Sequence, residues 1–287
     1  SQLVHLYRAY LLEDEDAAKA EVHLASGLSS VGNHPLRIEE TGMFDRLAAL
    51  CPENAVVHYL YGNLLYYIGQ KENGLAQWRM AADLDPSSAL ACRNVGFGEG
   101  QKGNYEEALK YYDKAIKNNP DDPLLFAESD KICEKAGVPA IQRQKRLETG
   151  LKTVMKYDDA VIRLLKVYNE TGNWNKAIKI MDSRHFHLWE GGGEIHDIYV
   201  MSHILKGKSL LDRKAYKKAM EEFRLATLYP DNLEVPAPAK SVTIEDVIAE
   251  MRQELNDNYA KFGDEDSVSK AKSLDELEKL VKEIKMK

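Results

Sequence analysis

Apolar residues recur along most of the chain at intervals of three and four residues, which is the spacing of an amphipathic α-helix. Leu109, Tyr112 and Ile116 show this spacing most clearly. The pattern predicts an all-α protein. The expected helices span residues 2–12, 17–31, 35–50, 56–68, 73–84, 123–135, 243–262 and 274–286, with further helices inside 158–182 and 199–230.

The helix that carries this apolar stripe has recognisable ends. Asn104 is expected to be its N-cap, and Glu107, three residues later, completes a pair that resembles a capping box. Pro120 ends the helix, because proline cannot donate to the helical hydrogen-bond ladder. Glu106 and Lys110 stand one turn apart on the solvent face, where they are expected to form an ion pair.

A regular repeat runs through the central part of the chain. Pro52, Pro86 and Pro120 are evenly spaced, and small and aromatic residues between them recur at matching places. The matched pairs are Gly62 with Gly96, Trp78 with Tyr112, and Ala81 with Ala115. A period of roughly 34 residues with a closing proline is the signature of the tetratricopeptide repeat (TPR), a helix-turn-helix unit. The chain is therefore identified as a TPR-like array.

Stacking follows from the repeat, because no single unit buries its apolar face alone. We expect a right-handed α-solenoid in which the first helix of each unit, helix A, lines a concave surface. Gly62 and Gly96 lie in the middle of A helices, where glycine costs about 1 kcal/mol relative to alanine, so a second helix is expected to cross closely there. The expected domains are a degenerate repeat at 1–51, a solenoid of about five units at 52–235, and a linker with a helical tail at 236–287.

Composition narrows the functional classes. The 287 residues carry a net charge of −7, which argues against a nucleic-acid partner, and no run approaches the roughly 20 apolar residues of a membrane span. Three cysteines without a CxxC pair indicate buried thiols in a reducing compartment, so a cytoplasmic location is expected. The chain starts at Ser1 without a signal-like segment and looks like a piece of a longer protein. No cofactor is expected.

One stretch departs from the repeat. Residues 183–197, between the fourth and fifth units, hold three histidines, an arginine, a tryptophan and three acidic residues around a run of three glycines. His185 and His187 share one face of an extended segment. With His196 or Glu190 they suggest a metal site, although their spacing matches no established zinc pattern.

Two other interpretations of this inserted loop, residues 184–197, remain open. As a structural loop, it uses Phe186 and Trp189 to plug the gap between units and Glu190 or Asp197 to cap helices. As a binding loop, it contacts a ligand or glycan, since the glycines permit a close approach of the backbone. No residue is assigned as catalytic or as a metal ligand.

The run from Asp158 to Leu233 resembles a segment of large bacterial TPR proteins. In these proteins an uncharacterised N-terminal β-rich domain, suspected of a carbohydrate-related function, precedes a helical array. The matching residues are Leu165, Tyr168-Asn169, Gly172, Ala177, Arg184, Phe186, Trp189-Glu190-Gly191-Gly192, Tyr199, Gly207, Ala219, Phe223, Tyr229-Pro230 and Asn232-Leu233. The resemblance covers Ala55 to Leu233 and implies the repeat region without the β-domain, hence without any activity of that domain. After Val235 the chain departs from it.

One side of each A helix is expected to face the concave groove. It carries Tyr59, Asn63 and Tyr66 in one unit and Arg93 and Phe97 in the next. Tyrosine and arginine are enriched at binding hot spots, and an aromatic groove also suits sugar rings. Tyrosines at helical spacing are equally typical of packing between repeats. The groove has too few lysines and arginines for the carboxylate clamp of chaperone-binding arrays.

These observations support a non-catalytic scaffold that binds a protein segment, or a neighbouring domain of its parent, in the concave face. The alternative is an accessory glycan-binding part of a carbohydrate-processing enzyme, and a third hypothesis is metal binding by His185, His187 and His196. The candidate ligand-binding residues are Tyr59, Asn63, Tyr66, Arg93, Phe97, Arg184, His185, His187, Trp189 and Glu190.

Overall fold

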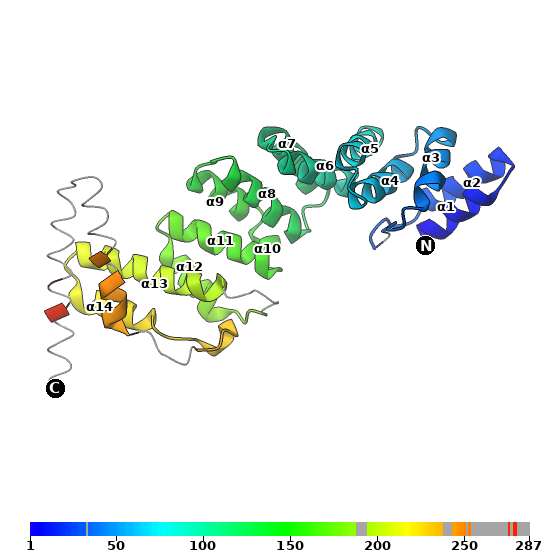
Figure 1. Ribbon diagram of the computed structural model, residues 1–287. Coiled ribbons are helices and arrows are strands. Elements are labelled where there is room, and N and C mark those ends of the chain that lie inside the picture. Colours follow the sequence, from blue (N-terminus) through cyan, green and yellow to red (C-terminus); the bar gives the residue numbers. More distant parts are fainter. Residues whose placement is uncertain are drawn as a thin grey trace. The chain divides into compact units, whose positions relative to one another are not determined.

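The computed structural model describes residues 1–32, 34–187, 194–237, 243–250, 252–253, 275 and 278–279. Within these residues all regular secondary structure is helical (Figure 1), which confirms the all-α prediction. No helix among them is long and apolar enough to cross a membrane. The helices are α1 (Gln2–Leu11), α2 (Glu15–Ser26), α3 (Glu40–Leu50), α4 (Ala55–Tyr67), α5 (Lys71–Leu84), α6 (Ala89–Gln101), α7 (Tyr105–Asn118), α8 (Pro123–Lys135), α9 (Ala140–Thr149), α10 (Leu151–Val154), α11 (Asp158–Glu170), α12 (Trp174–Ser183), α13 (Glu194–Asp212), α14 (Tyr216–Leu225) and the 3-10 helix η1 (Asp231–Leu233).

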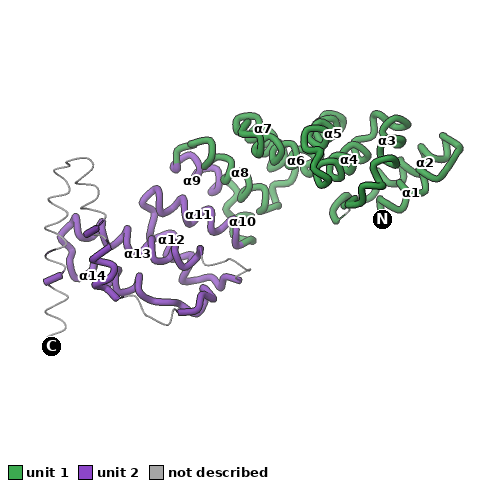
Figure 2. The backbone as a smooth tube through the Cα atoms, viewed as in Figure 1, with its two compact units in different colours: residues 1–139, 149–157 green, residues 140–148, 158–287 purple. Residues whose placement is uncertain are grey.

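The helices fall into two compact units, which Figure 2 draws in green and purple. Unit 1 comprises residues 1–139 and 149–157 and holds α1 to α8 and α10, whereas unit 2 comprises residues 140–148 and 158–287 and holds α9, α11 to α14 and η1. Within unit 1, α4 packs on α5 and α6 packs on α7; within unit 2, α11 packs on α12 and α13 on α14 (Figure 1). This stacking of consecutive helix pairs is the helical-repeat, α-solenoid architecture that the sequence period predicts.

The first helices of three successive pairs begin with the same device. Asn54, Ser88 and Asp122 occupy N-cap positions at the same spacing as the three prolines. The side-chain oxygen of each accepts a hydrogen bond from a backbone amide of the first turn. A cap of this kind stabilises a helix by about 1 kcal/mol, so the repeat extends to the residues that start its helices.

The predicted capping box at the start of α7 is wrong. Asn104 is the N-cap residue, but its side chain accepts no hydrogen bond from the first turn. Its Nδ2 instead donates to Glu99 Oε2 at 2.8 Å, and Glu99 also accepts from Arg79 at 2.6 Å. Glu99 is 1 % exposed, and a buried carboxylate requires donors. The predicted ion pair between Glu106 and Lys110 is confirmed at 3.2 Å.

The third helix starts later than expected. The sequence predicts a helix from Pro35, but α3 begins only at Glu40. The Glu40 carboxylate accepts hydrogen bonds from the backbone amide of Arg37 at 3.0 Å and from the Tyr7 hydroxyl at 2.6 Å. Glu40 therefore satisfies the turn that precedes the helix, and the chain from Pro35 to Arg37 is not helical.

The second helix ends earlier than expected. The pattern predicts a helix to residue 31, whereas α2 ends at Ser26. Gln2 is fully buried, and its Nε2 donates to the carbonyl oxygens of Ala25 at 3.2 Å and Leu28 at 2.8 Å. A side chain from α1 therefore satisfies carbonyls that the end of a helix leaves without partners.

The beginning of the C-terminal tail packs on the last helix pair. Residues 244–250 are helical, and Val247 and Ile248 are buried in one cluster with Leu211 of α13 and Phe223 of α14. The terminal unit of a stacked array needs such a cover for its apolar side. Beyond residue 250 the structure describes only residues 252–253, 275 and 278–279, which are helical; the last three fall within the predicted helix 274–286, whose other residues lie outside the described part of the chain.

A buried histidine of α13 lies against a glutamate of α14 in unit 2. His203 of α13 is 2 % exposed, and its Nδ1 lies 2.8 Å from Glu222 Oε2 on α14. Its Nε2 is buried and has no hydrogen-bond partner among the described atoms. Burial lowers the pKa of His203 below its ordinary value of 6.5. The positive charge of Lys206 lowers the pKa further, whereas Glu222 and Asp182 raise it without cancelling the effect of burial.

We expect this histidine to destabilise the fold as the pH falls. Because the pKa is lower in the folded chain, the unfolded chain binds the proton first. The neutral His203 side chain makes its full contribution to stability above about pH 6.5. This contribution is lost as the pH falls from there toward the folded-state pKa. Urea midpoints of the wild-type chain and of His203→Gln should therefore diverge below that pH. Parallel pH profiles would contradict the assignment.

Candidate functional site

The exposed side of α4, α6 and α8 in unit 1, called here the A-helix face, carries four of the five predicted groove residues. Asn63 and Tyr66 come from α4, Arg93 and Phe97 from α6, and all four are half-buried. The fifth, Tyr59, is 8 % exposed and belongs to the core. Hydrogen bonds and ring contacts between neighbouring helices join the four into one continuous surface.

Aromatic rings form the first part of this face. Tyr66 stacks on Trp78 of α5 with ring centroids 4.7 Å apart, and Phe97 and Tyr66 meet edge to face with centroids 5.8 Å apart. Trp78 is 4 % exposed. Aromatic pairs of this geometry contribute about 0.5–1.5 kcal/mol beyond their burial. Tyr66 and Phe97 are thus held rigidly while part of each ring stays open to solvent.

Asn63 is the polar centre of the face. Its Oδ1 accepts two hydrogen bonds, from Trp78 Nε1 and from Asn94 Nδ2, both at 2.9 Å. The indole of Trp78 can only donate, so the amide oxygen must face it and the amide nitrogen must face the other way. In the part of the chain that the structure describes, Asn63 Nδ2 makes no hydrogen bond. Two oriented donors are therefore presented on the A-helix face.

An ion pair between Arg93 of α6 and Glu128 of α8 forms the last part of the A-helix face. Arg93 donates to Glu128 through Nε at 2.8 Å and through Nη2 at 2.5 Å, and Tyr112 donates to the same carboxylate at 3.2 Å. Burial alone lowers the pKa of Arg93, but the hydrogen bonds and charge of Glu128 raise it above its ordinary value. Burial and the Glu128 charge likewise raise the pKa of Tyr112. Arg93 therefore keeps its positive charge at neutral pH, and its side chain remains 29 % exposed.

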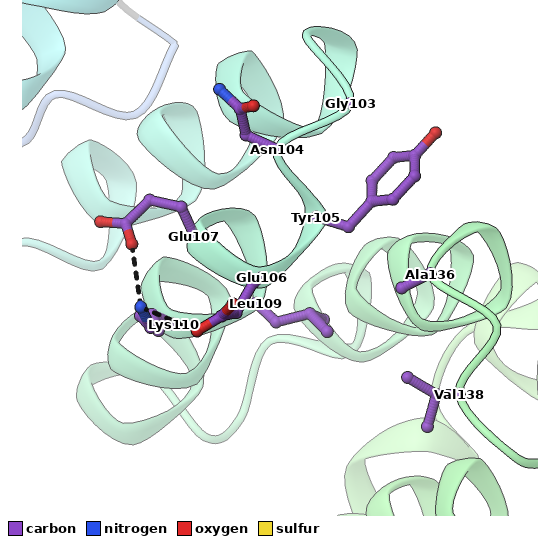
Figure 3. Close-up of a pocket in the computed structure, with 9 residues that line it drawn as sticks. All are labelled: Gly103, Asn104, Tyr105, Glu106, Glu107, Leu109, Lys110, Ala136 and Val138. Carbon is purple, nitrogen blue, oxygen red and sulfur yellow. Dashed lines mark hydrogen bonds and ion pairs between the residues drawn. The ribbon is translucent and has the colours of Figure 1, made fainter.

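A hollow of about 670 Å³ lies elsewhere in unit 1, between the first turn of α7 and the turn after α8. Figure 3 shows Tyr105 and Leu109 on one side of it and Ala136 and Val138 on the other. Lys110 at its rim is already paired with two glutamates. None of the predicted ligand-binding residues lines this hollow.

In unit 2, the described part of the inserted loop is held to the protein on one side. Arg184 donates through Nε to Asp158 Oδ1 at 2.8 Å, and the backbone amide of His187 donates to Asp158 Oδ2 at 3.0 Å. Phe186 is 1 % exposed, which agrees with the structural interpretation of the loop as far as this ring is concerned. Trp189 and Glu190 lie outside the described residues.

The two neighbouring histidines meet a carboxylate that the sequence analysis did not select. His185 Nε2 lies 2.6 Å and His187 Nδ1 lies 3.7 Å from Glu234 Oε1. The imidazole rings are 5.2 Å apart. All three side chains are exposed.

The inserted loop is shorter than predicted, and His196 does not join the other histidines. Helix α13 begins at Glu194, so His196 and Asp197 belong to its first turn. His196 is 8 % exposed, its Nε2 lies 3.0 Å from the carbonyl oxygen of Leu228, and its ring stacks on Tyr229 with centroids 3.9 Å apart. The hypothesis that combined His196 with His185 and His187 is therefore wrong.

Three residues that the sequence analysis missed complete these arrangements: Asn94, Glu128 and Glu234. Asn94 of α6 and Glu128 of α8 are polar residues on the same side of their helices as the predicted groove residues. A search of the groove positions for polar as well as aromatic side chains would have found them. Glu234 lies 49 residues after His185, and no local pattern connects the two.

Comparison with known proteins identifies one repeat unit of the chain. Residues 89–122 match the family model of the tetratricopeptide repeat, which confirms the predicted repeat type for that unit. Over 153 residues the chain is 25 % identical to the DnaJ homolog subfamily C member 7 homolog of Schizosaccharomyces pombe, covering 47 % of this chain and 31 % of that protein. Over 116 residues it is 26 % identical to small glutamine-rich tetratricopeptide repeat-containing protein 2 of Mycosarcoma maydis, covering 39 % of this chain and 32 % of that protein.

The chain spans about a third of the length of these two curated relatives. Among solved structures, it is similar to YrrB, described as a TPR protein with an unusual peptide-binding site. The TM-score is 0.48 at 19 % sequence identity, and the match covers 64 % of this chain and 90 % of YrrB.

Proposed function

We propose that this chain is a non-catalytic binding scaffold whose A-helix face docks an extended segment of a protein partner. The observation that carries the proposal is the Asn63 amide, whose orientation is imposed by two donors and whose Nδ2 is not buried and has no hydrogen-bond partner among the described residues. An extended peptide segment carries backbone carbonyls that lack partners. Asn63 supplies the donors that such a carbonyl needs.

The surroundings of Asn63 suit the same occupant. Tyr66 and Phe97 offer a rigid, partly exposed apolar surface beside the amide, and aromatic anchors of this kind are enriched at binding hot spots. Arg93, on the other side, is positioned by Glu128 with part of its side chain exposed. The face thus combines an apolar anchor, a carbonyl-binding amide and a cation within three adjacent helices.

Asn63→Asp is the variant that separates binding from folding. Aspartate keeps an oxygen to accept from Trp78 and Asn94, but it replaces the outward donors by a second acceptor, which repels a peptide carbonyl. We expect peptides selected from a displayed random library against the wild-type chain to bind Asn63→Asp at least ten-fold more weakly, a loss of about 1.4 kcal/mol. The thermal midpoint should change little.

Asn73→Asp is the matched control, because it makes the same charge change at an exposed asparagine of α5. It should bind the selected peptides as the wild-type chain does. Failure of the library to yield any binder, or equal binding by Asn63→Asp and Asn73→Asp, would overturn the proposal.

The identity of the partner stays a prediction. A neighbouring domain of a larger bacterial protein and a separate cytoplasmic protein both provide extended segments of the required chemistry. The glycan-binding alternative depends on Trp189, Glu190 and His185; the first two lie outside the described residues, and no described contact of His185 adds support to it.

A further inference from the structure

A short extended segment and a tight turn run side by side at the end of α12 in unit 2. The segment consists of residues 184–187, and the turn consists of residues 231–234, which include η1. The backbone amide of Phe186 donates to the carbonyl oxygen of Asn232 at 2.9 Å. Asn232 Nδ2 donates back to the carbonyl oxygens of Arg184 at 2.8 Å and of Met181 at 2.7 Å. These hydrogen bonds hold the two segments in one relative position.

The alternation of an extended backbone decides which side chains face outward. Phe186 points into the interior, where it is 1 % exposed, so its neighbours His185 and His187 lie on the opposite, solvent side. Asp158 fixes both ends of the segment through Arg184 and the amide of His187. The two imidazoles therefore lie together on the solvent side of a backbone segment that Asp158 holds in place.

The third side chain reaches this place through an uncommon backbone conformation. Glu234 has φ +53° and ψ +17°, the left-handed region, which a residue other than glycine, asparagine or aspartate rarely adopts. Such a conformation costs on the order of 1 kcal/mol and persists where its surroundings require it. It brings the carboxylate over the two imidazoles, at 2.6 Å from His185 Nε2 and 3.7 Å from His187 Nδ1.

From this geometry we infer that His185, His187 and Glu234 form a binding site for a divalent first-row transition-metal ion, with Zn²⁺ the ion that suits it best. One ligand atom from each side chain lies within 4.8 Å of the other two. Ligands bound to zinc at about 2.0–2.2 Å in tetrahedral geometry lie roughly 3.4 Å from one another. The present separations of 2.6 and 3.7 Å bracket that value, so small side-chain rotations admit the ion.

The donor set selects the class of ion. Two imidazole nitrogens with one carboxylate suit zinc and its neighbours, whereas calcium and magnesium prefer oxygen ligands. Three protein ligands leave at least one coordination position for water. The bound ion would join residues 185–187 to Glu234, which closes the connection between α12 and η1 and stabilises unit 2 by mass action.

The experiment is a zinc titration of the untagged full chain by calorimetry, with Co²⁺ as a spectroscopic substitute. We expect one Zn²⁺ per chain, a rise in the thermal midpoint with added zinc, and visible Co²⁺ absorption bands that zinc displaces. His187→Ala and Glu234→Gln should each weaken zinc binding at least ten-fold. Both replace exposed side chains, and Glu234→Gln keeps the size of the side chain.

His23→Ala and His34→Ala are the matched controls, because both remove exposed histidines far from the cluster in sequence. They should bind one zinc ion as the wild-type chain does. The inference is overturned if the wild-type chain binds no zinc, or if the control variants lose as much affinity as His187→Ala. Binding that survives Glu234→Gln undiminished would remove the carboxylate from the site and overturn it equally.

Discussion

Replacing Phe186 with alanine is expected to destabilise the chain by about 3–5 kcal/mol, the usual loss for a fully buried aromatic ring. Phe186 is 1 % exposed, and the guanidinium of Arg184 lies 5.5 Å from its ring centroid. Removing the ring leaves a cavity below the segment that Asp158 and Asn232 hold in place. The free energy of unfolding, measured by urea titration of the full chain, should fall by that amount.

His187→Ala is the natural comparison, because it truncates the next outward side chain of the same segment. His187 is 77 % exposed, and substitutions at such positions usually change stability by less than about 0.5 kcal/mol. If Phe186→Ala and His187→Ala unfold at the same urea concentration in zinc-free buffer, the segment is not anchored through Phe186. The metal site would then lack its rigid base.

The inserted loop illustrates what a local pattern predicts and what it does not. Alternation along Arg184 to His187 places His185 and His187 on one face, as expected from the sequence, and the buried Phe186 ring on the other. His196 was grouped with them because it is close in sequence, yet α13 starts before it and turns it toward Leu228. Glu234 was missed because its proximity arises from the return of the chain after α14.

The repeat made the fold predictable, but its polar details depended on burial. A search at the spacing of the repeat would have found the caps Asn54, Ser88 and Asp122 as readily as the prolines. The capping box at Asn104 matched a familiar motif and still failed, because the buried carboxylate of Glu99 competes for the same amide. Competition of this kind depends on three-dimensional burial, which the local motif does not contain.

The same distinction applies to the A-helix face. Spacing along α4 and α6 identified Asn63, Tyr66, Arg93 and Phe97 as neighbours, and their side chains do form one surface. The orientation of the Asn63 amide could not be predicted, since it requires the Trp78 indole from α5 on the correct side. That placement depends in turn on how closely α4 and α5 cross.

Gly62→Ala tests this crossing, and we expect it to destabilise the chain by about 3 kcal/mol, the upper part of the range for overpacking. A Cβ at Gly62 would lie 2.4 Å from Trp78 Cδ1 and 2.9 Å from the carbonyl oxygen of Gly74. The backbone oxygen cannot rotate away, so the helices must separate. Gly74 and Ala108 occupy the same position in successive repeats. The repeat therefore also keeps a small residue at this position. The shift of the urea midpoint measures the effect.

Gly42→Ala on α3 is the matched control, because no heavy atom lies within 4 Å of the added Cβ. There the higher helix propensity of alanine should stabilise the chain by up to about 1 kcal/mol. Opposite signs at the two glycines would separate crowding from propensity. If Gly62→Ala instead unfolds at or above the wild-type midpoint, α4 and α5 do not cross in contact at this point. Trp78 would then not hold the Asn63 oxygen through its hydrogen bond. The Asn63 amide would have no fixed orientation, and the proposed peptide docking depends on that orientation.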